Sequence, residues 1–242
     1  AFCFLCCVRL VSRWFPPRKM AFVIGLIVTV AMMGGMVAQT PMTVLTHAVG
    51  WRHALLMDAF LGVLMLGLMM FFVKDAPEGY NLADQQAHAS SLGLLKTITL
   101  VMRNRQNWLA GIYTSMVNLP IFLFGALWGV MYLVQIHHLG RADAGLVTMM
   151  LFVGIIFGSP VFGWLSDRIR HRKGPMMLGA VGSLGLLLLI MYVPHLSFDM
   201  LSFLFFALGF MSGAQVLGYP LVAESNPISF TGTAEGLAST II

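Results

Sequence analysis

A stretch of twelve residues, "GWLSDRIRHRKG" at 163–174, holds five charged residues and one histidine between two long apolar runs. An acidic side chain at a helix end can accept hydrogen bonds from the N-terminus of a neighbouring helix, which contributes roughly 0.3–2 kcal/mol. If a nearby arginine also holds the acid, the contact can form in one conformation and break in another. Asp167 is the single acid of this stretch. We therefore expect it to act as a latch, with Gly163 allowing the helix end to approach its neighbour closely.

The composition of the chain predicts an all-α integral membrane protein. Of its 242 residues, 59% are hydrophobic and 10% are charged, whereas soluble domains carry about 25% charged residues. The few charges cluster between long apolar runs, as a lipid-facing chain requires. The net charge of +5 does not indicate nucleic-acid binding, because no basic face on a soluble fold accompanies it. Cys3, Cys6 and Cys7 have no second cysteine or histidine cluster at ligand spacing, so we expect neither a metal nor a cofactor.

The apolar runs define the expected transmembrane helices, since about 20 apolar residues cross the hydrocarbon core. Complete spans are expected at 20–46, 53–73, 108–136, 142–165, 175–194 and 198–223. The tail of another span occupies 1–11 and a further one starts near residue 230, so we expect a fragment of a longer protein. The long polar segment 74–107 divides the chain into an N-terminal part, 1–73, and a C-terminal part, 108–242. Helical spacing within "SSLGLLKTITLVMRN" suggests a helix along the membrane surface.

The distribution of lysine and arginine predicts the orientation. If successive loops alternate sides, Arg52 and Arg141 lie on one side, and the other twelve of the fourteen basic residues lie on the opposite side. The positive-inside rule assigns that richer side to the cytoplasm. Loops at 9–19, 74–107, 166–174 and 224–229 are therefore expected in the cytoplasm of a multi-pass plasma membrane protein, with a bacterial inner membrane favoured.

The stretch "GWLSDRIRHRK" resembles the G-x-L-a-D-r-x-G-r-k motif of major facilitator superfamily transporters. Gly163, Leu165, Asp167 and Arg168 match at the motif's own spacing, Arg170 replaces the usual glycine, and the basic pair Arg172 and Lys173 follows one residue later than in the motif. Three spans and a long loop precede the span that ends in it, so the stretch is similar to the second copy of the motif, which joins helices 8 and 9. The resemblance covers the whole chain, from the end of helix 4 into helix 11 of a fold with two six-helix halves. "RLVSRWFPPRKMAFVIG" and "AESNPISFTGTAEGL" are similar to the helix 4–5 and helix 10–11 connections.

The resemblance also implies roles for particular residues. Gly163, Asp167, Arg168, Arg172 and Lys173 would form the gating motif, with Asp167 facing the start of the span that begins near Arg18 to Ala21. That contact would help to hold the outward-facing state.

The family architecture implies a central cavity whose lining includes helices 7 and 10. Candidate contacts for a solute are the polar and amphipathic residues of these two spans: Tyr113, Asn118, Trp128, Tyr132, Gln215 and Tyr219. Pro120 beside Asn118 indicates a local break, and interrupted helices expose backbone to solutes in transporters. Each candidate has a simpler alternative, a hydrogen bond between helices or a place in the interfacial aromatic belt.

Two acids near the ends of spans are further candidates, because an intramembrane acid is costly unless it has a function. Asp58 lies about one and a half turns into its span, and Glu224 lies near the end of the 198–223 span. Either could bind a proton or form an ion pair. For Asp58 we favour an ion pair with Arg52 or His53.

These features together predict a monomeric secondary transporter rather than an enzyme. It would move a small organic solute by alternating access, coupled to a proton gradient, within the lipid bilayer. No arginine lies in the middle of the complete spans, which favours a neutral or zwitterionic solute such as a sugar, amino acid or small peptide. Alternatives are an efflux antiporter for drugs or metabolites, less favoured because the Gly-Pro signature is absent from 25–41, and a non-transporting receptor or channel.

Overall fold

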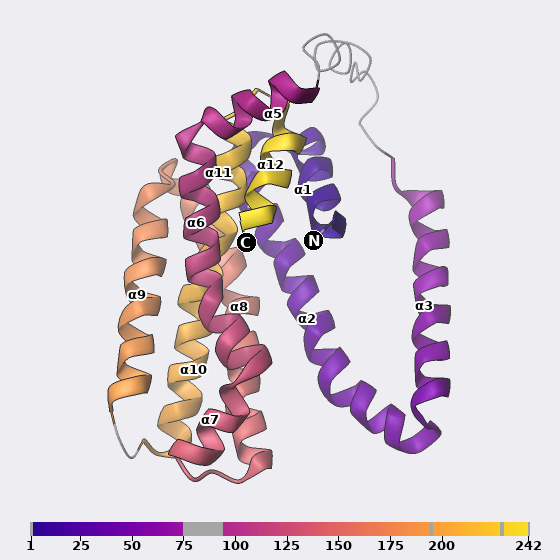
Figure 1. Ribbon diagram of the computed structural model, residues 1–242, viewed down its shortest axis with the longest axis vertical. Coiled ribbons are helices and arrows are strands. Elements are labelled where there is room, and N and C mark those ends of the chain that lie inside the picture. The colour runs from indigo at the N-terminus through magenta and orange to yellow at the C-terminus, as the bar shows by residue number, and fades with distance from the viewer. Residues whose placement is uncertain (1, 75–93, 194–195, 228–229, 242) are drawn as a thin grey trace.

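The computed structural model describes residues 2–74, 94–193, 196–227 and 230–241, and within these ranges every element is helical (Figure 1). The elements are α1 Phe2–Trp14, α2 Pro17–Val49, α3 Trp51–Phe72, α5 Leu94–Arg103, α6 Arg105–Pro120, η1 Ile121–Leu127, α7 Gly129–Ile136, α8 Arg141–Ile169, α9 Lys173–Tyr192, α10 Phe198–Ser212, η2 Gly213–Leu217, α11 Gly218–Glu224 and α12 Thr231–Ile241. Six helical segments are long and apolar enough to cross a membrane. The predicted all-α membrane fold is confirmed.

Each of the six segments overlaps one of the six complete spans expected from the sequence. Most ends agree within four residues, whereas Lys19–Met36 and Arg105–Leu127 end ten and nine residues earlier than expected. The turn between α2 and α3 is tighter than predicted, because Gly50 alone separates the two helices. Gly50 has φ 82°, a backbone conformation that a residue with a Cβ rarely adopts. The chain therefore reverses at Gly50 without a longer loop.

Two of the spans are interrupted, and a proline stands near each interruption. After Pro120 the chain forms a π-helix over η1, where the Trp128 amide donates to the Leu123 carbonyl at 2.7 Å. The break expected beside Asn118 is present. In the other span the 3₁₀ segment η2 precedes Pro220, which has no amide hydrogen to bond the carbonyl four residues before it. Both spans therefore depart from α-helical hydrogen bonding at these segments.

Helix α8 is the centre of the packing. It lies against both α2 and α10, and eleven of its residues are buried. Helix α3 is equally apolar but stands apart from the bundle in Figure 1 and buries only Ala54. The two helices are equally apolar, but α8 is packed among several other helices and α3 is not. Apolar composition therefore predicts that a helix lies in the membrane, and it does not predict whether the helix packs against protein.

The basic residues gather at one end of the bundle, which we call the basic end. It carries the start of α2, the start of α6 and the end of α8, and α5 lies across it at the top of Figure 1. Helices α3 and α8 begin at the opposite end, where Arg52 and Arg141 lie. Helix α5 falls within the expected surface helix, and residues 75–93 of the predicted inter-half loop lie outside the described residues.

Candidate functional site

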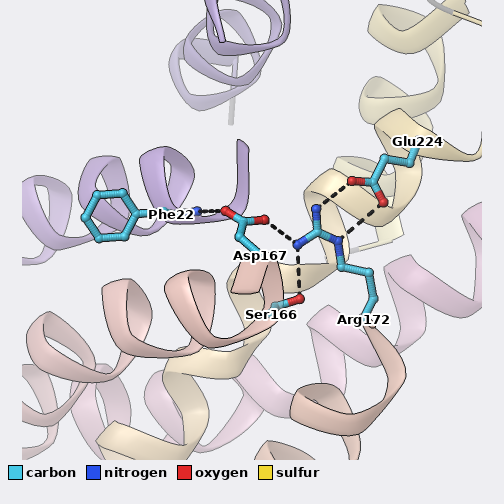
Figure 2. Close-up of polar contacts among 5 residues, drawn as sticks. All are labelled: Phe22, Ser166, Asp167, Arg172 and Glu224. Carbon is cyan, nitrogen blue, oxygen red and sulfur yellow. Dashed lines mark hydrogen bonds and ion pairs between the residues drawn. The ribbon is translucent and has the colours of Figure 1, made fainter. Parts of the chain in front are cut away.

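The acid of the 163–174 stretch joins two helices that are far apart in the sequence. Asp167 lies in the last turn of α8, and its Oδ2 accepts a hydrogen bond of 2.9 Å from the backbone amide of Phe22 in α2 (Figure 2). Its other carboxylate oxygen, Oδ1, accepts a hydrogen bond of 2.7 Å from Arg172. The contact falls one residue beyond the stretch from Arg18 to Ala21 that the resemblance implied. The side chain is 8% exposed, so water screens these bonds little.

Gly163 explains how Asp167 reaches α2. A Cβ atom added to Gly163 would lie 2.5 Å from the carbonyl oxygen of Ala21, so a side chain at this position would push the two backbones apart. Gly163 and Asp167 are four residues apart and share one face of α8. The glycine lets this face touch α2, and Asp167 on the same face then meets the amide of Phe22.

Arg172 connects Asp167 to a third helix. Its guanidinium donates two hydrogen bonds to Glu224 at the end of α11, at 2.5 and 3.3 Å, and one of 3.0 Å to the hydroxyl of Ser166. Burial alone would lower the pKa of Arg172, but the hydrogen bonds and negative charges of Glu224 and Asp167 outweigh it and raise this pKa. The group formed by Phe22, Ser166, Asp167, Arg172 and Glu224, here named the ionic cluster, therefore holds α2, α8 and α11 together (Figure 2).

The other residues of the motif lie outside the ionic cluster. Arg168 is exposed, with its guanidinium 5.1 Å from the centre of the Trp164 ring, and Lys173 is exposed as well. Arg170 ends α8 with φ 56° and ψ 23°, a left-handed conformation. This conformation explains why the family motif has glycine at the position, since an L-residue is strained there.

A cavity of about 250 Å³ lies between the N-terminal helices α1 and α2 and elements of the C-terminal part. Its lining is largely apolar and contains three of the six predicted solute contacts: Asn118, Gln215 and Tyr219. Gln215 is 5% exposed and belongs to the irregular segment η2. The Tyr219 ring packs edge-to-face on Phe4 of α1, with 4.7 Å between the ring centres.

The other three predicted contacts do not line this cavity. The Tyr113 hydroxyl donates to the backbone carbonyls of Met176 and Ala214, at 3.1 and 3.3 Å, and the Tyr132 hydroxyl donates to Ile190 at 3.0 Å. Both side chains therefore tie α6 and α7 to α9. Trp128 is 66% exposed on the surface of the bundle. For the two tyrosines the alternative reading, hydrogen bonding between helices, describes the structure.

The ion pair favoured for Asp58 is not formed among the described residues. Asp58 is exposed on α3 and makes no ion pair with any residue that the structure describes. Arg52 and His53 precede it by six and five residues, which places them roughly 120° and 140° away around the helix. Arg52 lies instead over the ring of Trp51, at 5.1 Å from its centre. Glu224, the other candidate acid, is paired with Arg172.

Sequence reasoning missed a cluster of asparagines at the basic end. The side-chain nitrogen Nδ2 of Asn226 donates to Oδ1 of Asn107 at 2.6 Å. The Nδ2 atoms of Asn107 and Asn104 each donate to Oδ1 of Asn226 at 3.2 Å. The cluster ties the start of α6 to the segment between α11 and α12. The position of these asparagines near helix ends was the one local signal in the sequence. It is a weak signal, because asparagine is common at helix ends as a capping residue.

Sequence reasoning also missed Glu235, an acid within the last expected span. It is 1% exposed, and neither carboxylate oxygen has a hydrogen-bond partner among the residues that the structure describes. An acid inside a membrane span is energetically costly, which makes it a candidate functional residue. This signal selected Asp58 and Glu224 and could have identified Glu235 as well.

The family model described as Major Facilitator Superfamily matches residues 1–140 and again residues 110–242, so the two matches together cover the chain. The chain belongs to the major facilitator superfamily. This agrees with the motif around Asp167 and with the six apolar helices.

Three curated relatives are all named for transport rather than for an enzymatic reaction. The probable sulfoacetate transporter of Cupriavidus necator is 27% identical and covers 96% of this chain and 57% of its own length. The probable hexose phosphate transport protein of Chlamydia trachomatis is 23% identical over 95% of this chain and 56% of its own length. The probable galactarate/D-glucarate transporter of Escherichia coli is 22% identical, with the same two shares. The chain thus spans little more than half the length of these relatives.

Proposed function

We propose that this chain forms part of a secondary transporter that moves a small organic anion across the membrane by alternating access. The observation that carries the proposal is the ionic cluster, which joins α8 to α2 at one end of the bundle. Helices α1 and α2 meet elements of the C-terminal part again at the cavity lined by Asn118, Gln215 and Tyr219. A contact that closes one end beside a central cavity is what alternating access requires.

The proposed solute is an anion, which departs from the neutral or zwitterionic solute expected from the sequence. The relatives named for sulfoacetate, hexose phosphate and galactarate/D-glucarate all carry solutes with an acidic group. The amide of Asn118, the amide of Gln215 and the hydroxyl of Tyr219 can donate hydrogen bonds to such a group or to a sugar hydroxyl. A positive partner for the anion would come from a part of the transporter outside this chain.

The proposed mechanism places the basic end in the cytoplasm, following the positive-inside rule. While the ionic cluster is intact, α2 and α8 stay joined there and the solute exchanges with the outside. Opening toward the cytoplasm separates Asp167 from the Phe22 amide. We further propose that a proton gradient drives the cycle.

Uptake by the full-length protein in proteoliposomes tests the function. We expect saturable accumulation of sulfoacetate, glucarate or a hexose phosphate when an inward proton gradient is imposed, and no accumulation of the uncharged hexose. Accumulation of the uncharged hexose alone would contradict the choice of an anion. Flux that neither saturates nor responds to the gradient would indicate a channel instead.

The cavity has its own matched test. Gln215→Leu should raise KM for the transported anion by about tenfold, the effect of losing one hydrogen bond to a charged group. The control is Gln135→Leu, which makes the same change at an exposed position of α7. Equal KM values for the two variants would remove Gln215 from the solute site.

The role of the ionic cluster is tested with Asp167→Ala. We expect slower transport with unchanged surface expression, because the variant removes the contact with Phe22 and leaves the spans intact. Transport at the wild-type rate would contradict a role in gating.

A further inference from the structure

Glu235 is the one acid of the described residues that is both buried and without a partner. It lies four residues after the start of α12, its side chain is 1% exposed, and it makes no hydrogen bond or ion pair with any residue the structure describes. Its neighbours on α12, Ala234 and Ala238, belong to an apolar cluster that also includes Val101, Ala110 and Val222.

Helix α12 packs against α1, α5, α6 and α11, and each of these helices carries groups that titrate or bear charge. They are Cys6, Cys7, Arg9 and Arg13 on α1, Lys96 and Arg103 on α5, Arg105 and Tyr113 on α6, and Tyr219 and Glu224 on α11. Tyr219 lies near Glu235, and no hydrogen bond joins the two side chains. Arg9 runs along Gly232, one turn before Glu235, yet bonds neither carboxylate oxygen.

An ionised carboxylate is not stable in such a place. Moving it from water into an apolar interior without a donor or a cation costs so much free energy that the group takes up a proton instead. As long as α1 and α12 stay packed, the Glu235 side chain is thus a neutral carboxylic acid. When water reaches the Glu235 carboxyl group, the ionised form is solvated, and the proton can leave.

We propose that Glu235 is a proton-binding site of the transporter, protonated while α1 and α12 are packed together and deprotonated when the basic end opens to water. This inference rests on the proposed function and names the group that carries the proton in it. One proton binds one carboxylate oxygen from the side of the cavity and later leaves to water at the basic end, so each opening of the basic end moves one proton.

Tyr219 supplies the connection between this proton and the solute. Its side chain lines the cavity, packs on Phe4 of α1 and lies near Glu235. A solute that displaces the Tyr219 ring would therefore disturb the contact between α1 and α11 and the surroundings of Glu235 together. Binding of the solute and release of the proton are coupled through this one side chain.

Infrared spectroscopy of the purified full-length protein tests the protonation directly and needs no solute. At about pH 7 the carboxylic acid of Glu235 should give a C=O stretch that is absent from ionised carboxylates, which have pKa values near 4 in water. We expect this band to disappear in Glu235→Gln and to persist in the control Glu224→Gln, whose side chain is 33% exposed. If Glu235→Gln does not fold, Glu235→Asp should displace the band. A spectrum that neither change alters would overturn the proposal, as it would show Glu235 ionised beside a cation from outside this chain.

A transport assay with glucarate as the probe tests the coupling. Glu235→Gln should lower gradient-driven accumulation at least about tenfold and change exchange of glucarate, with equal concentrations inside and outside, by less than about twofold. Wild-type accumulation by Glu235→Gln would overturn the proposal. If the wild-type protein transports neither glucarate nor the other anions, the proposed function fails, and the infrared spectrum still decides whether Glu235 holds a proton.

Discussion

The ionic cluster and Glu235 are two acidic regions near the same end of the bundle, and they treat negative charge in opposite ways. In the cluster, Asp167 and Glu224 share Arg172, and the Phe22 amide completes the shell of Asp167. Around Glu235 no described residue donates a hydrogen bond. The side chains of Asp167 and Glu235 are both largely buried. The two regions therefore do not differ in the burial of the acid. They differ in whether the carboxylate has hydrogen-bond and ion-pair partners.

The two regions respond differently to a conformational change. A paired acid keeps its charge and resists separation from its partners, because the unpaired ions would have to be solvated again. An unpaired buried acid keeps a proton and gives it up when water arrives. The ionic cluster is suited to holding α2, α8 and α11 together, and Glu235 is suited to responding when water reaches the contact between α1 and α12.

The largest expected effect comes from breaking the approach of the two helices without changing any charge. Gly163→Val places a side chain where a Cβ would lie 2.5 Å from the Ala21 carbonyl oxygen. Backbone cannot yield as a flexible side chain does, so the ionic cluster should not form. We expect uptake of the transported anion to fall more than about tenfold while the protein still inserts. The control Gly174→Val adds the same side chain where nothing lies within 4 Å; equal losses in both variants would refute the explanation.

The second-largest effect is expected when the acids of the ionic cluster lose their cation and are left without a charged partner, as Glu235 is. Arg172→Met leaves Asp167 and Glu224 without their shared cation. Removing one partner from a fully buried pair costs roughly 3–5 kcal/mol, and because Glu224 is 33% exposed we expect about 2–3 kcal/mol here. Denaturant titration of the purified protein measures the free energy of unfolding. A free energy of unfolding equal to that of the wild-type protein would argue against unpaired acids as the cause of the loss.

A smaller effect is expected from Arg170→Gly. This variant tests whether Arg172→Met acts through the lost partner of the two acids or only through the lost positive charge. Arg170→Gly removes the same positive charge as Arg172→Met, two residues away. Because Arg170 is held at φ 56°, glycine should stabilise the protein by roughly 1 kcal/mol in the same titration. Uptake should stay at the wild-type level. Destabilisation by this variant would mean that the arginine side chain contributes more than its backbone strain costs.

The smallest effect is expected from Glu224→Gln, which keeps the shape of the side chain and an acceptor oxygen for Arg172. Its 33% exposure limits the lost ion pair to less than about 1 kcal/mol. The melting temperature in detergent should change little. A loss as large as that of Arg172→Met would place Glu224, rather than Asp167, at the centre of the ionic cluster.

The helices could be predicted from the sequence because lipid imposes one requirement on every span. Each needs about 20 apolar residues, and the runs between polar segments satisfy that requirement directly. The break after Pro120 was also predictable, since proline removes a backbone donor. The exposure of α3 and the burial of α8 were not, because both helices are apolar all round and only tertiary packing distinguishes them.

The sites were predictable only where a motif fixed the geometry. Asp167 and Gly163 lie four residues apart on one helical face, so their common neighbour could be expected. The tyrosines could not be assigned, because a phenol that bonds a backbone carbonyl and one that faces a cavity have the same sequence pattern. The asparagine cluster joins residues 119 positions apart, and nothing local in the sequence encodes that contact.

A distance measurement across the ionic cluster tests the central claim, that this cluster joins α2 to α8 and must break for transport. Spin labels at Lys19→Cys and Arg170→Cys, both exposed in the structure, report the separation of the two helices in the full-length protein with its native cysteines replaced. We predict one short-distance population at rest, a second, longer one with a transported anion, and a dominant longer one in Asp167→Ala without the anion. Identical distance distributions in all three samples would contradict the account.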